Sequence, residues 1–396
     1  MKVNTDPQAI DEILSRGVQE LIDKEHLRKR LLSGERLRIK FGIDPTSPHM
    51  HLGHTVPLRK LRQFQDLGHE AVLIIGGATA MVGDPTGRSQ TRNQLSKAEV
   101  NSNKKTYLKQ AKKVLTADRL EVCNNADWFG KMPMSEFLGL TSLVTVQQVM
   151  QREDFRIRVD DAENPLTAIE ITYPVMQGYD SVMVKADVEI GGSDQLLNLH
   201  MGRRMQRRFH MSEQDILTVP LIEGTDGERK MSKSFANAII LEASPEEMFA
   251  QTMATKDELM VKYFTLITDL SLKEIDKIEA QMKQGENPRN IKARLAWEIV
   301  RMYHSSKEAD KAAAAFDRMF RDHVAPEDVP ELKLNGSMSI VDVLVAAKMV
   351  SSKTEARHVL DEGGVKVDGQ VVKAYDAIIK TGSMIQKGKR HFVKAV

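Results

Sequence analysis

The stretch that decides the fold is residues 37–75, LRIKFGIDPTSPHMHLGHTVPLRKLRQFQDLGHEAVLII. It begins with the strand candidate Leu37–Ile43 and ends with Val72–Ile75, whose branched apolar residues are typical of a parallel strand buried on both faces. Between them we predict a helix from about Leu52 to Leu67, which Gly68 ends. This order of strand, helix and strand indicates an α/β fold.

The same alternation continues along the chain. Further strand candidates are Leu120–Cys123, Asp187–Ile190 and Ile216–Val219. Helical stretches separate them, and Ser96 with Glu99 is a capping box that opens one of these. We therefore predict a Rossmann-like, doubly wound parallel sheet over residues 1–235.

The first residues favour a helix. Asp6-Pro7 is a helix start with proline at the first helical position. The apolar residues after it follow at roughly helical spacing: Ile10, Ile13, Leu14, Val18 and Leu21. We predict one helix through this stretch and a second, short helix that ends near Gly34.

Beyond residue 235 the pattern changes to helices alone. Ser244 with Glu247 and Ser271 with Glu274 are capping boxes, and no strand pattern occurs over 245–320. We predict an all-α domain at 236–322 and a linker at 323–337, which contains Pro326, Pro330 and Gly336 and shows no clear period.

Residues 338–396 predict a small α+β domain. Ser339 and Ser352 each open a short helix, Asp368-Gly369 turns a hairpin, and a last strand pair turns at Lys387-Gly388. This segment holds ten Lys and Arg against six Asp and Glu, a net charge of +4, while the whole chain has +2. The positive charge is therefore concentrated in the tail, although such charge is also common on a solvated surface.

The bulk composition excludes several classes of protein. The single cysteine, Cys123, rules out a disulfide framework and a multi-cysteine zinc site and fits a reducing compartment. The most apolar run, Ala71–Val82, is shorter than the roughly 20 residues of a membrane span. The N-terminus lacks the apolar stretch of a signal peptide. We therefore expect a cytoplasmic protein with no membrane association.

The turn after the first strand predicts a phosphate site. Gly42 and Asp44 stand at the carboxyl end of that strand, where ligands bind in open α/β sheets. His51 and His54 share one face at a helix N-terminus, which suits phosphate. Taken alone, these histidines and His49 are also compatible with surface residues or a metal site.

A second motif, Lys230-Met-Ser-Lys-Ser234, lies in a loop with Gly224 and Gly227. Lys230 and Lys233 are suited to neutralise a pyrophosphate as it leaves. Alone, such a pentapeptide is usually a solvated loop. Together and in this order, the two motifs are far more specific.

These motifs carry a resemblance. His51-Leu-Gly-His54 resembles the HIGH signature of class I aminoacyl-tRNA synthetases, and Lys230–Ser234 is identical to their KMSKS signature. Three further motifs resemble the tyrosine-specific branch: Gly83–Arg88, Tyr173–Asp180 and Gly191–Gln195. Residues 338–396 are similar to the S4-type RNA-binding module of the second bacterial type of this branch. The resemblance covers nearly the whole chain. It implies an enzyme that activates L-tyrosine with ATP and transfers it to the terminal ribose of tRNA(Tyr).

The resemblance also implies the residue roles. Asp84, Tyr173 and Gln177 would hold the amino group of tyrosine, Asp180 its hydroxyl and Gln195 its carboxyl end. The spacing of Tyr173, Gln177 and Asp180 suits one helical face, although a solvated amphipathic helix has the same spacing. The implied ATP site consists of Gly42, Asp44, His54, Gly192, Asp194 and Lys233. The implied catalytic residues are His51, His54, Lys230 and Lys233. Mg²⁺ would arrive with ATP, with no metal site in the chain itself.

Two positions depart from the family pattern. Lys40 stands where many members have a tyrosine that touches the substrate hydroxyl, and Glu189 stands where glutamine is common. Asp180 is then the only named partner of the hydroxyl. The resemblance further implies a homodimer, formed through the region near 128–160.

Other functions remain open at this point. A tryptophanyl-tRNA synthetase is the nearest alternative by fold, and Asp180 and the S4-like tail argue against it. A non-catalytic RNA-binding relative would have no need of the signature histidines and lysines. A P-loop NTPase is excluded because residues 76–88 lack a Gly-Lys-Ser/Thr ending.

Overall fold

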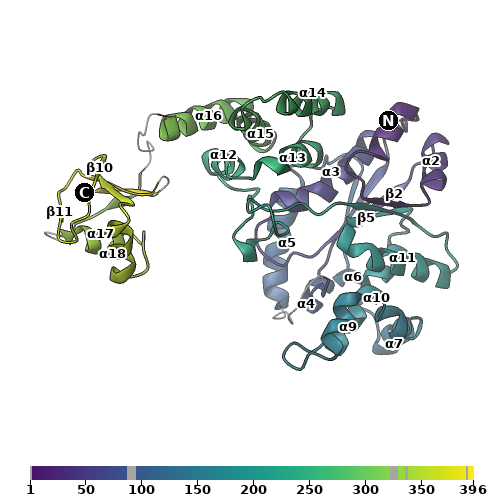
Figure 1. The fold of residues 1–396 in the computed structure, drawn as a ribbon. Helices are drawn as coiled ribbons and strands as arrows, with labels where there is room; N and C mark the ends of the chain where they lie inside the picture. Colours follow the sequence, from purple (N-terminus) through teal and green to yellow (C-terminus); the bar gives the residue numbers. More distant parts are fainter. Residues whose placement is uncertain (1, 87–94, 322–328, 335–337, 389–390) are drawn as a thin grey trace. The chain divides into compact units, whose positions relative to one another are not determined.

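The computed structural model describes residues 2–86, 95–321, 329–334, 338–388 and 391–396. The chain forms two compact units, Met1–Ala309 and Asp310–Val396 (Figure 1). The domain boundaries after residues 235, 322 and 337 stay predictions. Most of the predicted linker lies outside the described residues, as do Gly87 and Arg88 of the motif Gly83–Arg88.

A six-stranded sheet forms the centre of the first unit. Its order is β1-β6-β5-β2-β3-β4. Strands β2 to β6 are parallel to one another, and the edge strand β1 is antiparallel to β6. The strands are β1(Glu20–Ile22), β2(Arg38–Ile43), β3(Glu70–Ile75), β4(Leu120–Asn124), β5(Val188–Gly192) and β6(Asp215–Val219). Every strand candidate of this region is present, so the predicted α/β fold with a mostly parallel sheet is confirmed.

The long first helix is a wrong prediction beyond Ile13. Helix α1 spans Pro7–Ile13, and Gly17 then adopts φ +60°, a left-handed conformation that suits glycine. Leu21, predicted as helical, lies in β1 opposite Leu217 of β6. The backbone of residues 20–22 pairs with the open edge of β6. The local spacing of apolar residues does not reveal this partner, which lies almost 200 positions further along the chain.

The strand order places a switch point between β2 and β5. The chain moves from β2 outward to β3 through α3(Leu52–Asp66), and from β5 outward in the other direction to β6 through α11(Leu196–Arg208). Right-handed crossovers in opposite directions put these two helices on opposite faces of the sheet (Figure 1). The crevice at the carboxyl ends of β2 and β5 is where such sheets bind ligands.

The remaining helices of this region surround the sheet. They are α2(Lys24–Leu32), α4(Thr79–Val82), α5(Lys97–Ala111), α6(Ala126–Phe129), α7(Met134–Ser142), α8(Val146–Val149), α9(Glu153–Val159), α10(Ala168–Met183) and the short η1(Ser193–Gln195) and η2(Lys233–Phe235). The apolar run 71–82 is divided between β3 and α4. Within the described ranges, no helix combines the length and apolar character needed to cross a bilayer.

The predicted helical region follows the sheet. The described residues from 245 to 321 contain helices and no strand: α12(Pro245–Met253), η3(Asp257–Leu259), α13(Met260–Ile267), α14(Leu272–Lys283), α15(Pro288–Tyr303) and α16(Ser306–Arg321). Ser244 and Ser271 cap α12 and α14 as predicted. Side chains from the sheet region bond to the end of α13, where Arg59 donates to the carbonyl oxygen of Thr268 at 2.6 Å.

The second unit contains a mixed five-stranded sheet, ordered β10-β9-β12-β13-β7, and a separate strand pair, β11 with β8. Its elements are β7(Glu331–Leu332), β8(Met338–Ser339), α17(Ile340–Ala346), α18(Lys353–Asp361), β9(Val365–Val367), β10(Gln370–Val371), β11(Ile378–Ile379), β12(Met384–Lys387) and β13(His391–Ala395). Asp368 and Gly369 both have positive φ, as the predicted hairpin requires. The last strand pair, β12 with β13, is also present.

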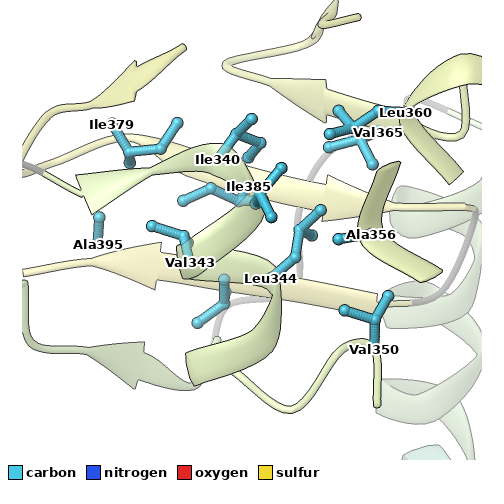
Figure 2. Close-up of a cluster of buried hydrophobic side chains, with 12 residues drawn as sticks. Ile340, Val343, Leu344, Val350, Ala356, Leu360, Val365, Ile379, Ile385 and Ala395 are labelled. Atoms are coloured by element: carbon cyan, nitrogen blue, oxygen red, sulfur yellow. The ribbon is translucent and has the colours of Figure 1, made fainter. Parts of the chain in front are cut away.

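The core of this unit is aliphatic. Ile340, Val343 and Leu344 of α17 point toward Ile385 of β12 and Val365 of β9 (Figure 2). All five side chains are fully buried. Two short helices can cover the small sheet because each presents one apolar face to it.

Candidate active site

A cavity of about 490 Å³ opens at the carboxyl ends of β2, β3 and β5. All of the predicted site residues line it: Gly42, Asp44, His51, His54, Asp84, Tyr173, Gln177, Asp180, Gly192, Asp194, Gln195, Lys230 and Lys233. The switch point of the sheet therefore brings together residues that are up to 191 positions apart in the sequence, from Gly42 to Lys233. Their individual roles stay predictions.

Asp180 is a buried acceptor in this cavity. Its side chain is 4% exposed, and its two oxygens accept hydrogen bonds from Trp128 Nε1 at 3.0 Å and Asn125 Nδ2 at 3.2 Å. Burial raises the pKa of Asp180 to about 7, and the nearby Lys40 ammonium together with the two hydrogen bonds opposes that rise. A buried carboxylate with such partners is suited to accept a hydrogen bond from a hydroxyl.

Tyr173 lies about two turns before Asp180 on α10 and lines the same cavity. Its hydroxyl donates a hydrogen bond to Asp44 Oδ2 at 3.0 Å. Thr79 Oγ1 donates to the other oxygen of Asp44 at 2.7 Å. A Cβ on Gly76 would come within 1.9 Å of Asp44 Oδ1, so only glycine permits this approach. Since the Tyr173 proton points to Asp44, its oxygen is oriented to accept from a cation in the cavity.

Asp84 is held by a network of side chains. It accepts from Thr86 Oγ1 at 2.6 Å and from Gln195 Nε2 at 2.8 Å. Arg152, buried to 5% exposure, donates to Thr86 Oγ1 and to Asn198 Oδ1, both at 3.0 Å. Asn198 in turn donates to Gln195 Oε1 at 2.8 Å. The chain of bonds fixes Asp84 and Gln195 before any ligand arrives.

The two histidines stack at the N-terminus of α3, with ring centroids 3.8 Å apart. The backbone N–H of His51 donates to His54 Nδ1 at 3.1 Å. Burial lowers the pKa of His51 to about 2 and that of His54 to about 4, and the charge of Lys233 acts in the same direction. Both rings are neutral at pH 7. Within the described part of the chain no group of three or more His, Cys, Asp or Glu side chains is arranged to hold a metal ion.

The KMSKS loop closes one side of the cavity. Met231 is buried, and its sulfur accepts a hydrogen bond from the Gly53 backbone N–H at 3.3 Å. Lys230 Nζ lies 3.5 Å from Asp194 Oδ2, and Lys233 Nζ donates to Ser47 Oγ at 3.0 Å and to the carbonyl oxygen of His49. The loop therefore holds Lys230 against Asp194 of the predicted ATP site and Lys233 against the turn that precedes His51.

The side chain of Asn237 shapes this loop. Its Oδ1 accepts from the Ser232 backbone N–H at 2.8 Å, and its Nδ2 donates to Asp226 at 3.0 Å. A Cβ on Gly224 would lie 2.2 Å from Asn237 Cγ, which explains the glycine. At Gly42, in contrast, a Cβ would meet no protein atom within 4 Å. Packing gives no reason for that glycine, and the space in front of it belongs to the cavity.

Several residues of the site were not predicted. Asn125 and Trp128, which hold Asp180, directly follow β4 at the same sheet edge as the other site residues. The rule that ligands bind at strand ends could have indicated them. Arg152, the residue before α9, and Asn198, in α11, belong to none of the predicted motifs, and only the folded structure connects them to Asp84 through Thr86 and Gln195.

Comparison with known proteins identifies the family. The family model for "tRNA synthetases class I (W and Y)" matches residues 32–321, and that for the "Tyrosine--tRNA ligase SYY-like C-terminal domain" matches residues 322–393. The tyrosine--tRNA ligase of Dehalococcoides mccartyi (strain 195) is 44% identical over 397 residues, 100% of both chains. The chain belongs to the tyrosine–tRNA ligases. The activity of this family is the ligation of tyrosine to tRNA with ATP as substrate.

Further relatives of the tyrosine–tRNA ligase family agree. The Thermotoga maritima ligase is 42% identical over 391 residues, covering 98% of this chain and 97% of its own. A C-terminally truncated mitochondrial tyrosyl-tRNA synthetase of Aspergillus nidulans has a similar fold, with a TM-score of 0.67 and 25% identity over 79% of this chain and 94% of that chain. The first family model covers both tryptophan and tyrosine enzymes, and the full-length relatives decide for tyrosine.

Proposed function

We propose that this cavity carries both steps of tyrosine–tRNA ligation, with the residue roles given below. The tyrosine carboxylate attacks the α-phosphorus of ATP, and the bond to the β-phosphate oxygen breaks to release pyrophosphate. The terminal ribose hydroxyl of tRNA(Tyr) then attacks the carbonyl carbon of the adenylate and releases AMP. The observation that carries this proposal is that a set of buried acceptors and two lysines line one cavity.

The acceptors suit tyrosine at both of its ends. Asp180 takes the phenol hydroxyl, and the acceptor atoms of Asp84, Tyr173 and Gln177 take the ammonium. Gln195 meets the carboxyl end. A tyrosine in this orientation presents its carboxylate toward the phosphate-binding segments, as the first step requires.

The opposite side of the cavity suits ATP. The open space at Gly42 and the Gly192–Asp194 turn provide room for adenosine, and the neutral rings of His51 and His54 can donate hydrogen bonds to phosphate without a proton change. Lys230 and Lys233 stabilise the charge that develops on the leaving pyrophosphate. Mg²⁺ enters as part of the substrate, bound to the phosphates of ATP.

A second copy of the chain covers an apolar surface on α7, α8 and α9. Met134, Leu138, Val146, Ile157 and Val159 are each more than half exposed. Such a surface is unusual for a monomer in water. Its location within 128–160 supports the homodimer that the family resemblance implies, and the molar mass in solution by sedimentation tests it.

The C-terminal unit acts as an S4-like module that holds tRNA. Among its described residues no charged side chain is buried, and its segment 338–396 carries a net charge of +4. Exposed lysines and arginines are suited to phosphate backbones. With ATP, tyrosine and tRNA as its substrates, the enzyme works in the cytoplasm.

Pyrophosphate exchange into ATP tests the proposal. The chain should exchange pyrophosphate with L-tyrosine and with none of the other amino acids at a comparable rate. If the exchange rate were highest with tryptophan, or if no amino acid supported exchange, the assigned pocket would be refuted.

A further inference from the structure

Lys40 and Glu189 form a fully buried ion pair at the inner wall of the cavity, which Lys40 itself lines. Lys40 is on β2 and Glu189 is its neighbour on β5, and their side chains are 0% and 1% exposed. Lys40 Nζ lies 2.8 Å from Glu189 Oε1 and donates to Ser181 Oγ at 2.7 Å and to the carbonyl oxygen of Gln177 at 2.9 Å. Three partners use the three protons of the ammonium, so Lys40 has none left for a ligand hydroxyl.

Glu189 also holds the side chain of Gln177. Gln177 Nε2 donates to Glu189 Oε1 at 3.2 Å. The other oxygen, Oε2, accepts from Ser181 Oγ at 3.1 Å and from Gln214 Nε2. An ionised carboxylate accepts hydrogen bonds and cannot donate them, so the amide of Gln177 must turn its NH₂ group toward Glu189.

This orientation leaves the amide oxygen of Gln177 for the cavity. Gln177 lines the cavity, and among the described residues no group donates to its Oε1. We propose that the Lys40–Glu189 pair is a positioning device that fixes the Gln177 amide with its oxygen toward the cavity, and so gives the site its recognition of the α-ammonium of the amino acid. The inference rests on the proposed function, in which Gln177 binds that ammonium.

Each member of the pair is needed for a different reason. Glu189 sets the polarity of the amide, because a neutral glutamine at position 189 could accept from Gln177 or donate to it. Lys40 supplies the opposite charge that the buried carboxylate of Glu189 needs, since a buried charge without a partner is strongly disfavoured. Lys40 also holds the backbone carbonyl of Gln177, so it anchors the residue on two sides.

The test compares L-tyrosine with 3-(4-hydroxyphenyl)propionate, which has the ring, hydroxyl and carboxylate but no ammonium. The native chain should bind tyrosine more tightly than this analogue, measured as an equilibrium Kd and a competitive Ki. In Glu189→Gln, tyrosine binding should weaken about tenfold, the size of one lost charge-assisted hydrogen bond. The Ki of the analogue should stay within about twofold, and the kcat of pyrophosphate exchange should change less than the KM for tyrosine.

Lys40→Met alone leaves a buried carboxylate without its cation and can fail to fold. The double variant Lys40→Met/Glu189→Gln removes both charges at nearly constant volume, and its thermal unfolding shows that it is folded. It should lose the preference for tyrosine over the analogue to the same extent as Glu189→Gln. A double variant that kept the native preference would overturn the proposal.

A matched control is available on the same helix. Glu170 at the start of α10 forms a buried ion pair with Arg158 at 2.7 Å and does not line the cavity. Glu170→Gln should keep the native preference for tyrosine, and an equal loss of preference there would overturn the proposal by showing that destabilisation alone produces it. If the native chain bound both compounds equally, the proposed ammonium site itself would fail. Native discrimination that persisted in Glu189→Gln would refute only the role of the pair.

Discussion

The two units of the molecule place their polar groups differently. Around the cavity of the first unit, charged side chains such as Lys40, Asp180 and Glu189 are buried, and each is held by polar partners. In the described part of the second unit no polar or charged side chain is buried, and the core is aliphatic (Figure 2). Buried charged groups can accelerate a reaction on a substrate, because electrostatic interactions are stronger away from water and the groups are already oriented. Binding to a phosphate backbone requires only exposed charges.

This contrast has consequences for mutations. A change at a buried site group should have a large effect that depends little on salt. A change in the second unit should have a smaller effect that salt reduces, because exposed charges are screened. Four predictions test this difference, from the largest expected effect to the smallest.

Asp180→Ala should produce the largest change. We expect kcat/KM for tyrosine to fall by about 10³-fold, while the weak use of phenylalanine changes far less, because only tyrosine has a hydroxyl to lose. Sites that bond a substrate hydroxyl strongly reject the analogue that lacks it, and tyrosyl-tRNA synthetases are already a known example of this rule. Pyrophosphate exchange with both amino acids measures the effect, and equal losses would place Asp180 away from the hydroxyl.

Lys230→Ala and Lys233→Ala should each slow adenylate formation by about 10²-fold, the effect of losing one oriented contact to the transition state. The equilibrium Kd for tyrosine should not change. Rapid-quench measurement of the first turnover tests this prediction. Lys256→Ala is the control, since Lys256 pairs with Glu228 of the same loop at 3.2 Å and does not line the cavity. Near-normal adenylate formation in both site variants would contradict the assigned role of the loop.

Removal of residues 331–396, which form most of the second unit, should affect only the tRNA step. A chain that ends at Pro330 should form tyrosyl-adenylate at the native rate but show a KM for tRNA raised by about tenfold or more, because fewer phosphates are neutralised. Its tRNA affinity should also fall less steeply with salt than that of the full chain. Aminoacylation across a salt series measures both quantities. If the shorter chain charged tRNA as the native chain does, residues 331–396 would have no role in tRNA binding.

The smallest effect concerns pH. The pKa of His51 is about 2 in the folded chain and near 6.5 when unfolded. Above pH 6.5 both states are neutral and His51 contributes nothing. As the pH falls below 6.5 the unfolded state takes up the proton first, so folded stability decreases, by about 1–2 kcal/mol at pH 5. The native chain should therefore lose about 2–4 °C more Tm between pH 7 and pH 5 than His51→Asn does. Identical losses would mean that the ring is protonated in the folded chain.

Much of the fold could be predicted because its signals are local. Branched apolar runs mark β2 and β3, and capping residues such as Ser96, Ser244 and Ser271 mark helix starts. Strand β1 could not be predicted, since Val18 and Leu21 continue a helical spacing and only the edge of β6 makes this stretch a strand. A partner that is distant in the sequence decided the structure there.

The site was predicted by its motifs and missed where it depends on strand order. Lys40 and Glu189 were each recognised as departures from the family pattern, but their pairing follows only once β2 and β5 are neighbours in register. In the same way Arg152 reaches Asp84 through Thr86 only in the folded chain. Motifs indicate which residues a ligand touches, whereas the bonds that hold those residues depend on tertiary structure.

The most direct test of the assigned site is a crystal structure with bound L-tyrosine. We predict that the phenol oxygen lies within about 2.6–3.2 Å of an Asp180 oxygen and that the ammonium lies at similar distances from Asp84, Tyr173 and Gln177 Oε1. The carboxylate should face His51 and the KMSKS loop. A tyrosine bound in the reverse direction, with its ammonium at Asp180, or bound outside this cavity, would contradict the account.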